Sequence, residues 1–133
     1  MGQYHTLVNI DKKEVVVPHA LGLGLKQWEH AGHEGGSLAD ALYILMMTSP
    51  AAGGGDFPET DVSGRWVGDR VLVLGDYTEK NAVPGVEDAS LINADESYTD
   101  IGDQVAEAMG SIFGWSVEGT GWKSRVPTVR TDA

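Results

Sequence analysis

The chain has 133 residues, no cysteine and a formal net charge of −11. This length predicts about one ordinary domain with a single core, and the missing cysteines exclude disulfides and thiolate metal ligands. The negative charge disfavours binding to nucleic acids or to anionic membranes. Between Glu79 and Glu107 there are eight acidic residues and one lysine. This cluster predicts a solvated acidic face, attraction to the mildly basic C-terminal tail, or a basic partner.

Nothing in the sequence predicts a membrane segment. The longest apolar run, Ala41–Met47, is far shorter than the about 20 residues that a membrane-spanning helix needs. The N-terminus lacks the basic and then apolar pattern of a signal peptide. We therefore expect a soluble, cytoplasmic protein without membrane contacts.

The first predicted element is an N-terminal hairpin. Apolar and polar residues alternate over Gln3–Ile10, which is typical of a strand. Turn-forming residues follow over Asn9–Lys13, and the β-branched run Val15–Val17 predicts the second strand. Pro18 has no backbone N–H to donate, so it should mark the end of that strand.

Three helices are predicted from apolar residues that recur at helical spacing. The first covers Leu21–His30. The second begins at Ser37, which forms a capping arrangement with Asp40, and ends before Pro50. The third covers Asp100–Phe113, where acidic residues near the start complement the helix dipole.

The segment Ser63–Tyr77 combines a strong core signal with a polar cluster. Arg65–Val67 and Arg70–Leu74 are predicted to be two strands joined by a type II′ turn at Gly68-Asp69. The run Val71–Leu74 is apolar on both faces of a strand, which predicts a central strand covered on both sides.

The rest of the chain is less regular. Thr78–Asp95 is predicted to be an acidic loop, and the segment from Trp115 shows no clear period. We expect a single α+β domain over residues 1–114, in which a small, mostly antiparallel sheet packs against two or three helices. Residues 115–133 should form a C-terminal tail, partly docked through tryptophans and partly disordered beyond Pro127.

The candidate binding residues flank the predicted central strand and are Trp66, Asp69, Arg70, Asp76 and Tyr77. Trp66 and Tyr77 could form an aromatic rim, and carboxylates at strand ends often serve as acids, bases or ligands. The simpler interpretation is that each Asp after Gly hydrogen-bonds the local backbone. A strand of about 17 Å separates Asp69 from Asp76, which favours a binding rim over a catalytic pair.

The weak metal-binding candidates are His30, His33 and Glu34. Histidines three apart share a helix face, but Gly32 interrupts the helix and no third ligand is specified. The sequence also lacks a nucleophile elbow and a phosphate-binding loop. It therefore nominates no catalytic residue and no cofactor, and enzymatic activity stays open but disfavoured.

Several stretches together resemble a family of small uncharacterised proteins from actinobacterial phages and some bacteria. These stretches are MGQYHTLVNIDKKE, Pro18-His19, Gly24-Leu25-Lys26 and GRWVGDRVLVLGDY. The resemblance covers about residues 1–78 and, more loosely, the helix that begins near Asp100. It implies a phage-like origin and no particular activity, and it does not extend to the tail from Trp115.

Together these features predict a non-enzymatic accessory protein that binds a host protein in the host-cell cytoplasm. The contact would be made by the acidic stretch or by the Trp66–Tyr77 rim. One alternative is a small enzyme or ligand-binding protein that uses Asp56, Asp69, Asp76 and a histidine around one pocket. A second alternative is a structural or virion component. The sequence does not specify an oligomeric state.

Overall fold

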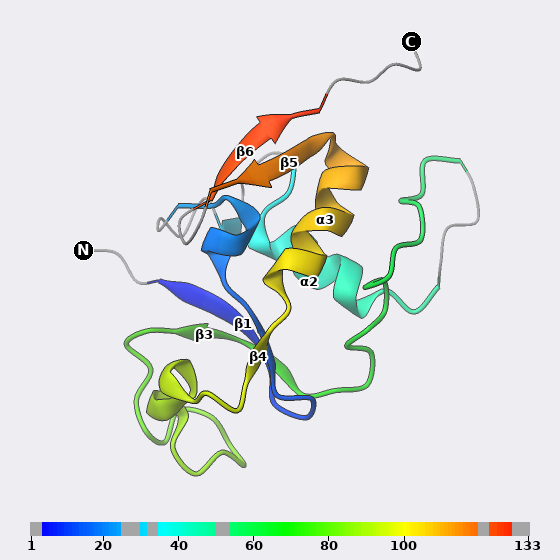
Figure 1. Ribbon diagram of the computed structural model, residues 1–133. Coiled ribbons are helices and arrows are strands. Elements are labelled where there is room, and N and C mark those ends of the chain that lie inside the picture. Colours follow the sequence, from blue (N-terminus) through cyan, green and yellow to red (C-terminus); the bar gives the residue numbers. More distant parts are fainter. Residues whose placement is uncertain (1–3, 25–29, 32–34, 50–53, 120–122, 129–133) are drawn as a thin grey trace.

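A mixed four-stranded sheet with the order β3-β1-β2-β4 forms the centre of the fold (Figure 1). The computed structural model describes residues 4–24, 30–31, 35–49, 54–119 and 123–128. The strands are β1 (His5–Asn9), β2 (Glu14–Val16), β3 (Val71–Gly75) and β4 (Thr99–Asp100). Antiparallel pairs join β1 to β2 and to β3, whereas β4 runs parallel to β2. The predicted α+β class and mostly antiparallel sheet are therefore confirmed.

The predicted N-terminal hairpin is present. Its turn is closed by Asn9, whose Oδ1 accepts a hydrogen bond from the Lys12 backbone N–H at 2.8 Å. After β2 the chain enters a short 3-10 helix, η1 (Pro18–Leu21), which begins at the residue expected to stop the strand.

The helix predicted over Leu21–His30 lies only partly within the described residues. Gly22 takes a left-handed φ of 71° and ends η1, so Leu21 ends a 3-10 helix and does not begin an α-helix. Gly suits this position because it has no Cβ to clash. Leu25 and Trp28, which lie four and seven residues after Leu21 and so suggested a helix, are outside the described residues.

Two α-helices cover one face of the sheet. Helix α2 (Leu38–Met46) begins with the predicted capping box, in which Ser37 and Asp40 each accept a hydrogen bond from the other's backbone N–H. Helix α3 (Gly102–Phe113) ends at Gly114, which has a left-handed φ of 82°. No helix within the described residues has both the length and the apolar character needed to cross a bilayer.

The larger core lies between these helices and the sheet. Strand residues Leu7 and Val16 are buried there against α2 and α3, together with Trp66. The helices contribute Leu38, Ala41, Ile44, Leu45, Val105, Ala106, Ala108 and Met109. We call this side of the sheet the helix face.

A second, smaller core covers the opposite side of the sheet, which we call the loop face. Val8 and Leu74 are buried there against Ala89 and Ile92. The last two residues belong to a 3-10 helix, η2 (Ala89–Ala94), within the predicted acidic loop. Figure 1 shows η2 and its loop on the side of the sheet away from α2 and α3.

The hairpin predicted around Gly68-Asp69 is wrong. Residues 61–68 form consecutive turns, and β3 pairs only with β1. The Trp66 side chain is fully buried, and its backbone N–H donates to the Leu45 carbonyl at 2.9 Å, which ties this segment to the end of α2. The segment therefore packs on the helix face and cannot form a strand beside β3.

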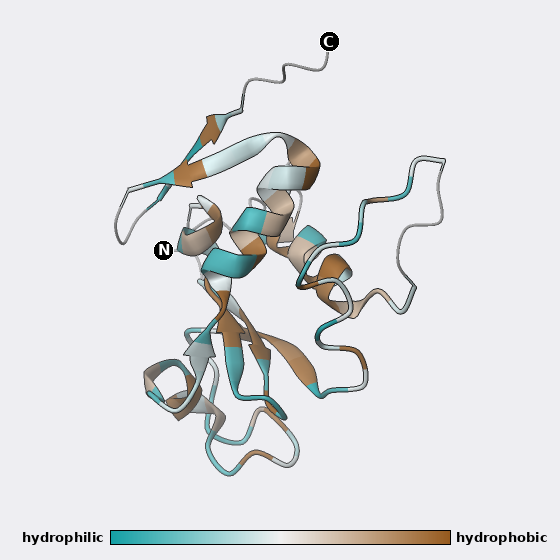
Figure 2. Cartoon of the chain, turned by 45° about the vertical axis from the view of Figure 1, so that its right-hand side comes forward, coloured by the Kyte–Doolittle hydropathy of each residue, from teal (hydrophilic) through white to brown (hydrophobic). Residues whose placement is uncertain are grey.

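Strand β3 is also not the predicted central strand. It lies at the edge of the sheet, and Val73 is 52% exposed. In Figure 2 the hydrophobic colour of β3 reflects its composition, Val-Leu-Val-Leu. Its apolar character on both faces arises because each face lies over a different core.

The segment from Trp115 contains strands that were not predicted. Strand β5 (Trp115–Glu118) pairs antiparallel with β6 (Ser124–Pro127) as a separate two-stranded sheet. Arg125 fixes this hairpin, because its guanidinium lies 4.0 Å from the Trp115 ring and its Nε donates to the Leu21 carbonyl at 2.7 Å. Burial lowers the pKa of Arg125 to about 10, so the side chain stays cationic at neutral pH. Trp122 and residues 129–133 lie outside the described residues.

Candidate functional site

Trp66 belongs to a buried polar contact and not to an exposed rim. Its indole Nε1 donates to Glu14 Oε1 at 2.9 Å, and Arg65 Nε donates to the same oxygen at 3.0 Å. The Glu14 side chain is only 9% exposed. A fully buried indole cannot offer a surface to a partner, so the predicted Trp66–Tyr77 rim does not form.

The Arg65 and Trp66 donors stabilise the negative charge of the Glu14 carboxylate. The Arg65 hydrogen bond, followed by the Trp66 hydrogen bond, lowers the pKa of Glu14 despite the opposing effect of burial. Glu14 is therefore ionised at neutral pH, and it joins β2 to the turns of residues 61–68. This contact stabilises the fold and leaves no free group for chemistry.

Asp69 and Arg70 lie at one end of β3 and are engaged by the N-terminal hairpin. Asp69 accepts hydrogen bonds from Asn9 Nδ2 at 2.8 Å and from the Lys12 ammonium, and these donors lower its pKa. Arg70 pairs with Asp11, with 2.9 Å between Arg70 Nη2 and Asp11 Oδ1. The two predicted binding residues therefore connect the start of β3 to the β1–β2 turn.

Asp76 and Tyr77 lie at the other end of β3. Asp76 Oδ1 accepts from the Tyr4 backbone N–H at 3.0 Å, and the Asp76 N–H donates to the Tyr4 carbonyl at 2.9 Å. Tyr77 is 64% exposed. Because the whole strand separates Asp69 from Asp76, they do not converge on one pocket, and the predicted carboxylate site is not formed.

A cluster of rings packs beside the start of β1. The Tyr4 ring centroid lies 5.3 Å from that of His19 and 6.2 Å from that of His30, and His5 lies 6.2 Å from His30. His30 Nε2 donates to the Gly24 carbonyl at 2.9 Å, because a carbonyl oxygen can only accept. The Nδ1 atoms of His5 and His30 are buried without a hydrogen-bond partner among the described residues.

This ring cluster does not amount to a metal centre. Within the described ranges, no group of three or more His, Asp or Glu side chains is arranged to hold a metal ion. The predicted candidates His33 and Glu34 lie outside those ranges. His30 itself is buried, with 4% of its surface exposed.

The best candidate for a functional surface is residues 76–98, which we call the cover segment. Its buried residues Ala89 and Ile92 hold it against the loop face of the sheet. Its internal hydrogen bonds include that from the Ala89 N–H to the Lys80 carbonyl at 3.0 Å. Asp88 begins η2 by accepting a hydrogen bond from the Ser90 N–H at 3.0 Å. The segment is therefore an ordered platform.

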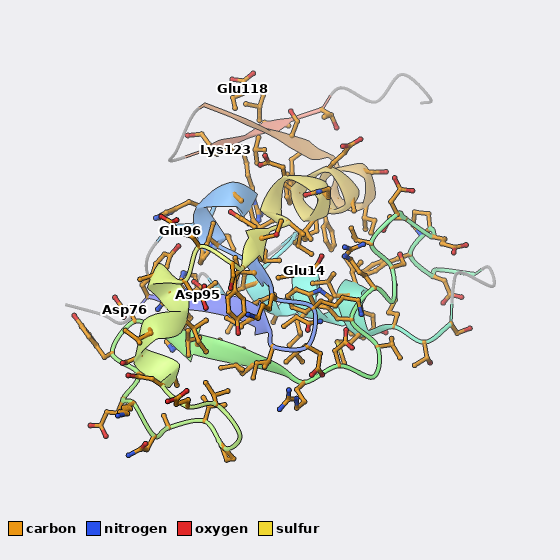
Figure 3. The ribbon with its side chains drawn as sticks, turned by 60° about the horizontal axis from the view of Figure 1, so that its bottom comes forward. Glu14, Asp76, Asp95, Glu96, Glu118 and Lys123 are labelled. Carbon is orange, nitrogen blue, oxygen red and sulfur yellow. The ribbon has the colours of Figure 1, made fainter. Side chains whose placement is uncertain are left out.

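The outer side of the cover segment is acidic. Its carboxylates form no ion pair within the described residues, where the pairs involve only Lys12, Arg65, Arg70 and Lys123. The segment's acidic residues are Asp76, Glu79, Glu87, Asp88, Asp95 and Glu96. Figure 3 places Asp76, Asp95 and Glu96 on one side of the molecule, away from Glu118 and Lys123 of the β5–β6 hairpin.

Two large apolar side chains stay exposed among these charges. Tyr77 is 64% exposed and Leu91 is 61% exposed. Aromatic and aliphatic side chains that project from a polar surface are typical anchors of protein–protein contacts. The cover segment therefore combines anchors with a field of negative charge.

A cleft of about 350 Å³ lies elsewhere, between the turns of residues 59–65 and helix α3. Glu59, Asp61 and Glu107 contribute charge to its lining, whereas Val62, Ile101 and Ala108 contribute apolar surface. Arg65 also borders the cleft, but its guanidinium is held by Glu14. This cleft is a second acidic region and offers a useful control for the first.

Sequence reasoning found the acidity of the cover segment but missed its anchoring. Ala89 and Ile92 gave no helical or strand period, so nothing indicated that they cover a sheet face. The role of Glu14 was also missed, because a carboxylate in a polar strand position is usually solvated.

Comparison with protein-family models, curated proteins and solved structures found no match to this chain. The resemblance to small phage and bacterial proteins therefore stays a prediction.

Proposed function

We propose that this protein is a non-enzymatic binding protein whose cover segment docks onto a basic surface of another protein. In line with the phage-like resemblance, the partner would be a protein of the host cell. The observation that carries the proposal is an ordered, acidic segment whose carboxylates lack ion pairs within the described residues and which exposes Tyr77 and Leu91.

Physical chemistry favours this use of the segment. Like charges crowded on one surface repel each other, and a cationic partner relieves that repulsion while it accelerates association. The buried side chains of Ala89 and Ile92 hold the cover segment against the sheet before binding. Little conformational entropy is therefore lost when the segment docks. A nucleic acid is disfavoured, because its phosphates would meet the same negative field.

The test is affinity capture from bacterial host lysate followed by mass spectrometry, with three forms of the protein compared. In the first variant Glu79, Glu87 and Glu96 are each replaced by Lys. In the matched control Glu59, Asp61 and Glu118 are each replaced by Lys, which changes the net charge equally at exposed sites outside the cover segment. Circular dichroism checks that both variants remain folded.

The wild type and the control should capture the same basic protein in similar amounts. The cover-segment variant should capture at least about tenfold less of that protein. Raising the salt concentration should weaken wild-type capture, because exposed charges are screened. Equal losses in both variants would show that only net charge matters. A larger loss in the control would assign binding to the cleft residues Glu59 and Asp61 or to Glu118 of β5, and either result would overturn the proposal.

A further inference from the structure

The outer edge of β3 is unpaired over residues 71–73, whereas at Gly75 the outward carbonyl already accepts from Thr78. The strand lies at the end of the sheet order and consists of Val71, Leu72, Val73, Leu74 and Gly75. Natural sheets usually protect such edges with Lys, Pro, a bulge or a covering segment, because unpaired backbone groups recruit other strands. The sequence of β3 contains neither Lys nor Pro, and its pairing with β1 runs through all five residues without a bulge.

The hydrogen-bond pattern identifies which backbone groups face outward. The Ile10 N–H donates to the Arg70 carbonyl, and the Asp76 N–H donates to the Tyr4 carbonyl, both at 2.9 Å. Even-numbered residues of this stretch therefore bond to β1, and Val71, Val73 and Gly75 direct their N–H and C=O groups away from it. The outward groups of Val71 and Val73 have no backbone partner among the described residues.

We propose that β3 pairs antiparallel with β3 of a second copy of this chain, around a twofold axis at Val73. In that register Val73 faces Val73 and exchanges both backbone hydrogen bonds with it. Val71 lies opposite Gly75 of the other copy, but Gly75 is buried and its carbonyl already accepts from the Thr78 N–H and hydroxyl, so the new backbone hydrogen bonds are those of Val73. The exposed Val73 side chains would then cover each other.

Charge complementarity favours this register and favours a second copy of the chain as the partner. Counting outward from Val73, Arg70 lies opposite Asp76 of the other copy at both ends of the contact. Sliding the strands by two residues would place Arg70 opposite Leu74, or Asp76 opposite Leu72. The edge is therefore complementary to itself, as a twofold interface requires.

Both charged groups have capacity for the added contact. The Arg70 side chain is 60% exposed and offers five N–H donors, only some of which bond Asp11. Asp76 is exposed, and within the described residues its side chain accepts only at Oδ1. The far end of the sheet is β4, which has only two residues, so pairing at β3 closes the assembly as a dimer.

The first experiment measures mass by light scattering from about 1 μM to about 1 mM protein. The wild type should shift from 14.2 kDa towards twice that mass. Val73→Lys should raise the dissociation constant at least about tenfold, because it places two like charges in contact. Tyr43→Lys, a matched change at an exposed residue of α2, should leave it unchanged.

The second experiment tests the register through charge exchange. Arg70→Asp and Asp76→Arg should each remain monomeric alone, because each places like charges opposite one another. When mixed, they should form a one-to-one heterodimer, since both cross-pairs become attractive. This rescue cannot arise from misfolding, because an unfolded variant would not recover on mixing.

A wild type that stays monomeric at about 1 mM overturns the proposal, because the β3 edge then does not pair with a second copy of this chain. A dimer that tolerates Val73→Lys, or single variants that show no rescue on mixing, also overturns it. Val73→Lys and Arg70→Asp lie outside the cover segment, so a loss of dimer in either is distinct from the test of partner binding, whereas Asp76→Arg lies inside it and is used only for rescue on mixing.

Discussion

The two faces of the sheet are covered in different ways. On the helix face, α2 and α3 bury a continuous cluster that includes Leu45 and Trp66. On the loop face, the cover segment contributes only Ala89 and Ile92 as fully buried residues. Burial of apolar area stabilises a fold roughly in proportion to that area, so the helix face should carry most of the stability. The loop face instead supports a charged surface on a thin apolar layer.

The largest expected effect is on the helix face. Leu45→Ala should lower the free energy of unfolding by about 3–5 kcal/mol, because Leu45 is fully buried and its neighbours in α2 cannot collapse into the cavity. Urea unfolding followed by circular dichroism measures this loss. A cost below about 1 kcal/mol would contradict the assignment of the main core to this face.

The next effect concerns the contact between β2 and the turns of residues 61–68. Glu14→Ala should cost about 3 kcal/mol, because it leaves the Arg65 guanidinium and the buried Trp66 N–H without their acceptor. Tryptophan fluorescence, to which all four tryptophans of the chain contribute, should shift towards the emission of solvent-exposed tryptophan at lower urea concentration than in the wild type. Arg65→Lys serves as the milder comparison, since it keeps the charge but loses the two-point hydrogen bonding.

The same carboxylate should make stability depend on pH. Because the Arg65 and Trp66 hydrogen bonds lower the pKa of Glu14 in the folded state, its contribution is fully present above the unfolded pKa of about 4.3. That contribution is lost as the pH falls through the lower folded-state pKa. Glu14→Gln should therefore flatten the decline of stability below about pH 4.3, as measured by urea unfolding across pH. An unchanged slope would show that Glu14 is not the group responsible.

A smaller effect is expected on the loop face. Ile92→Ala should cost about 2 kcal/mol, at the lower end for such changes, because the cover segment can relax into the gap. Hydrogen exchange should speed up in residues 76–98 and stay slow in α2 and α3. Equal acceleration in the helices would show that the two faces unfold as one unit.

The smallest effect on stability is expected on the outer side of the cover segment. Leu91→Ala should change the free energy of unfolding by less than about 0.5 kcal/mol, because Leu91 is 61% exposed. The same change should weaken capture of the basic partner, which separates binding from folding. If stability falls as much as in Ile92→Ala, Leu91 belongs to the core and not to the docking surface.

These differences also explain what the sequence could predict. The N-terminal hairpin, the Ser37 capping box and the third helix were found because their signals are local, such as alternation, a cap or a helical stripe. Strand β3 was wrongly predicted to be central because it is apolar on both faces. Its cover on the loop face comes from Ala89 and Ile92, which show neither helical nor strand periodicity. Strands β4, β5 and β6 have at most four residues, too few for a periodic pattern.

The candidate site followed the same division. The acidity of the cover segment could be read from composition, and it remains the basis of the proposed function. The roles of Trp66 and Asp69 could not, because each contacts residues more than fifty positions away: Glu14 for Trp66, and Asn9 and Lys12 for Asp69. Only the fold brings those partners together.

The order of the strands also has a consequence for how the protein is made. The β1–β2 hairpin leaves the ribosome before the neighbours of its two outer edges, which are residues 71–75 and 99–100. At about 5–20 residues per second, the last of these follows β2 by roughly 4–17 s. An isolated two-stranded hairpin is marginally stable, so during that interval β1 and β2 lack the neighbouring strands that stabilise them. A premature stop before β4 would therefore release a chain in which the outer edge of β2 has no partner strand.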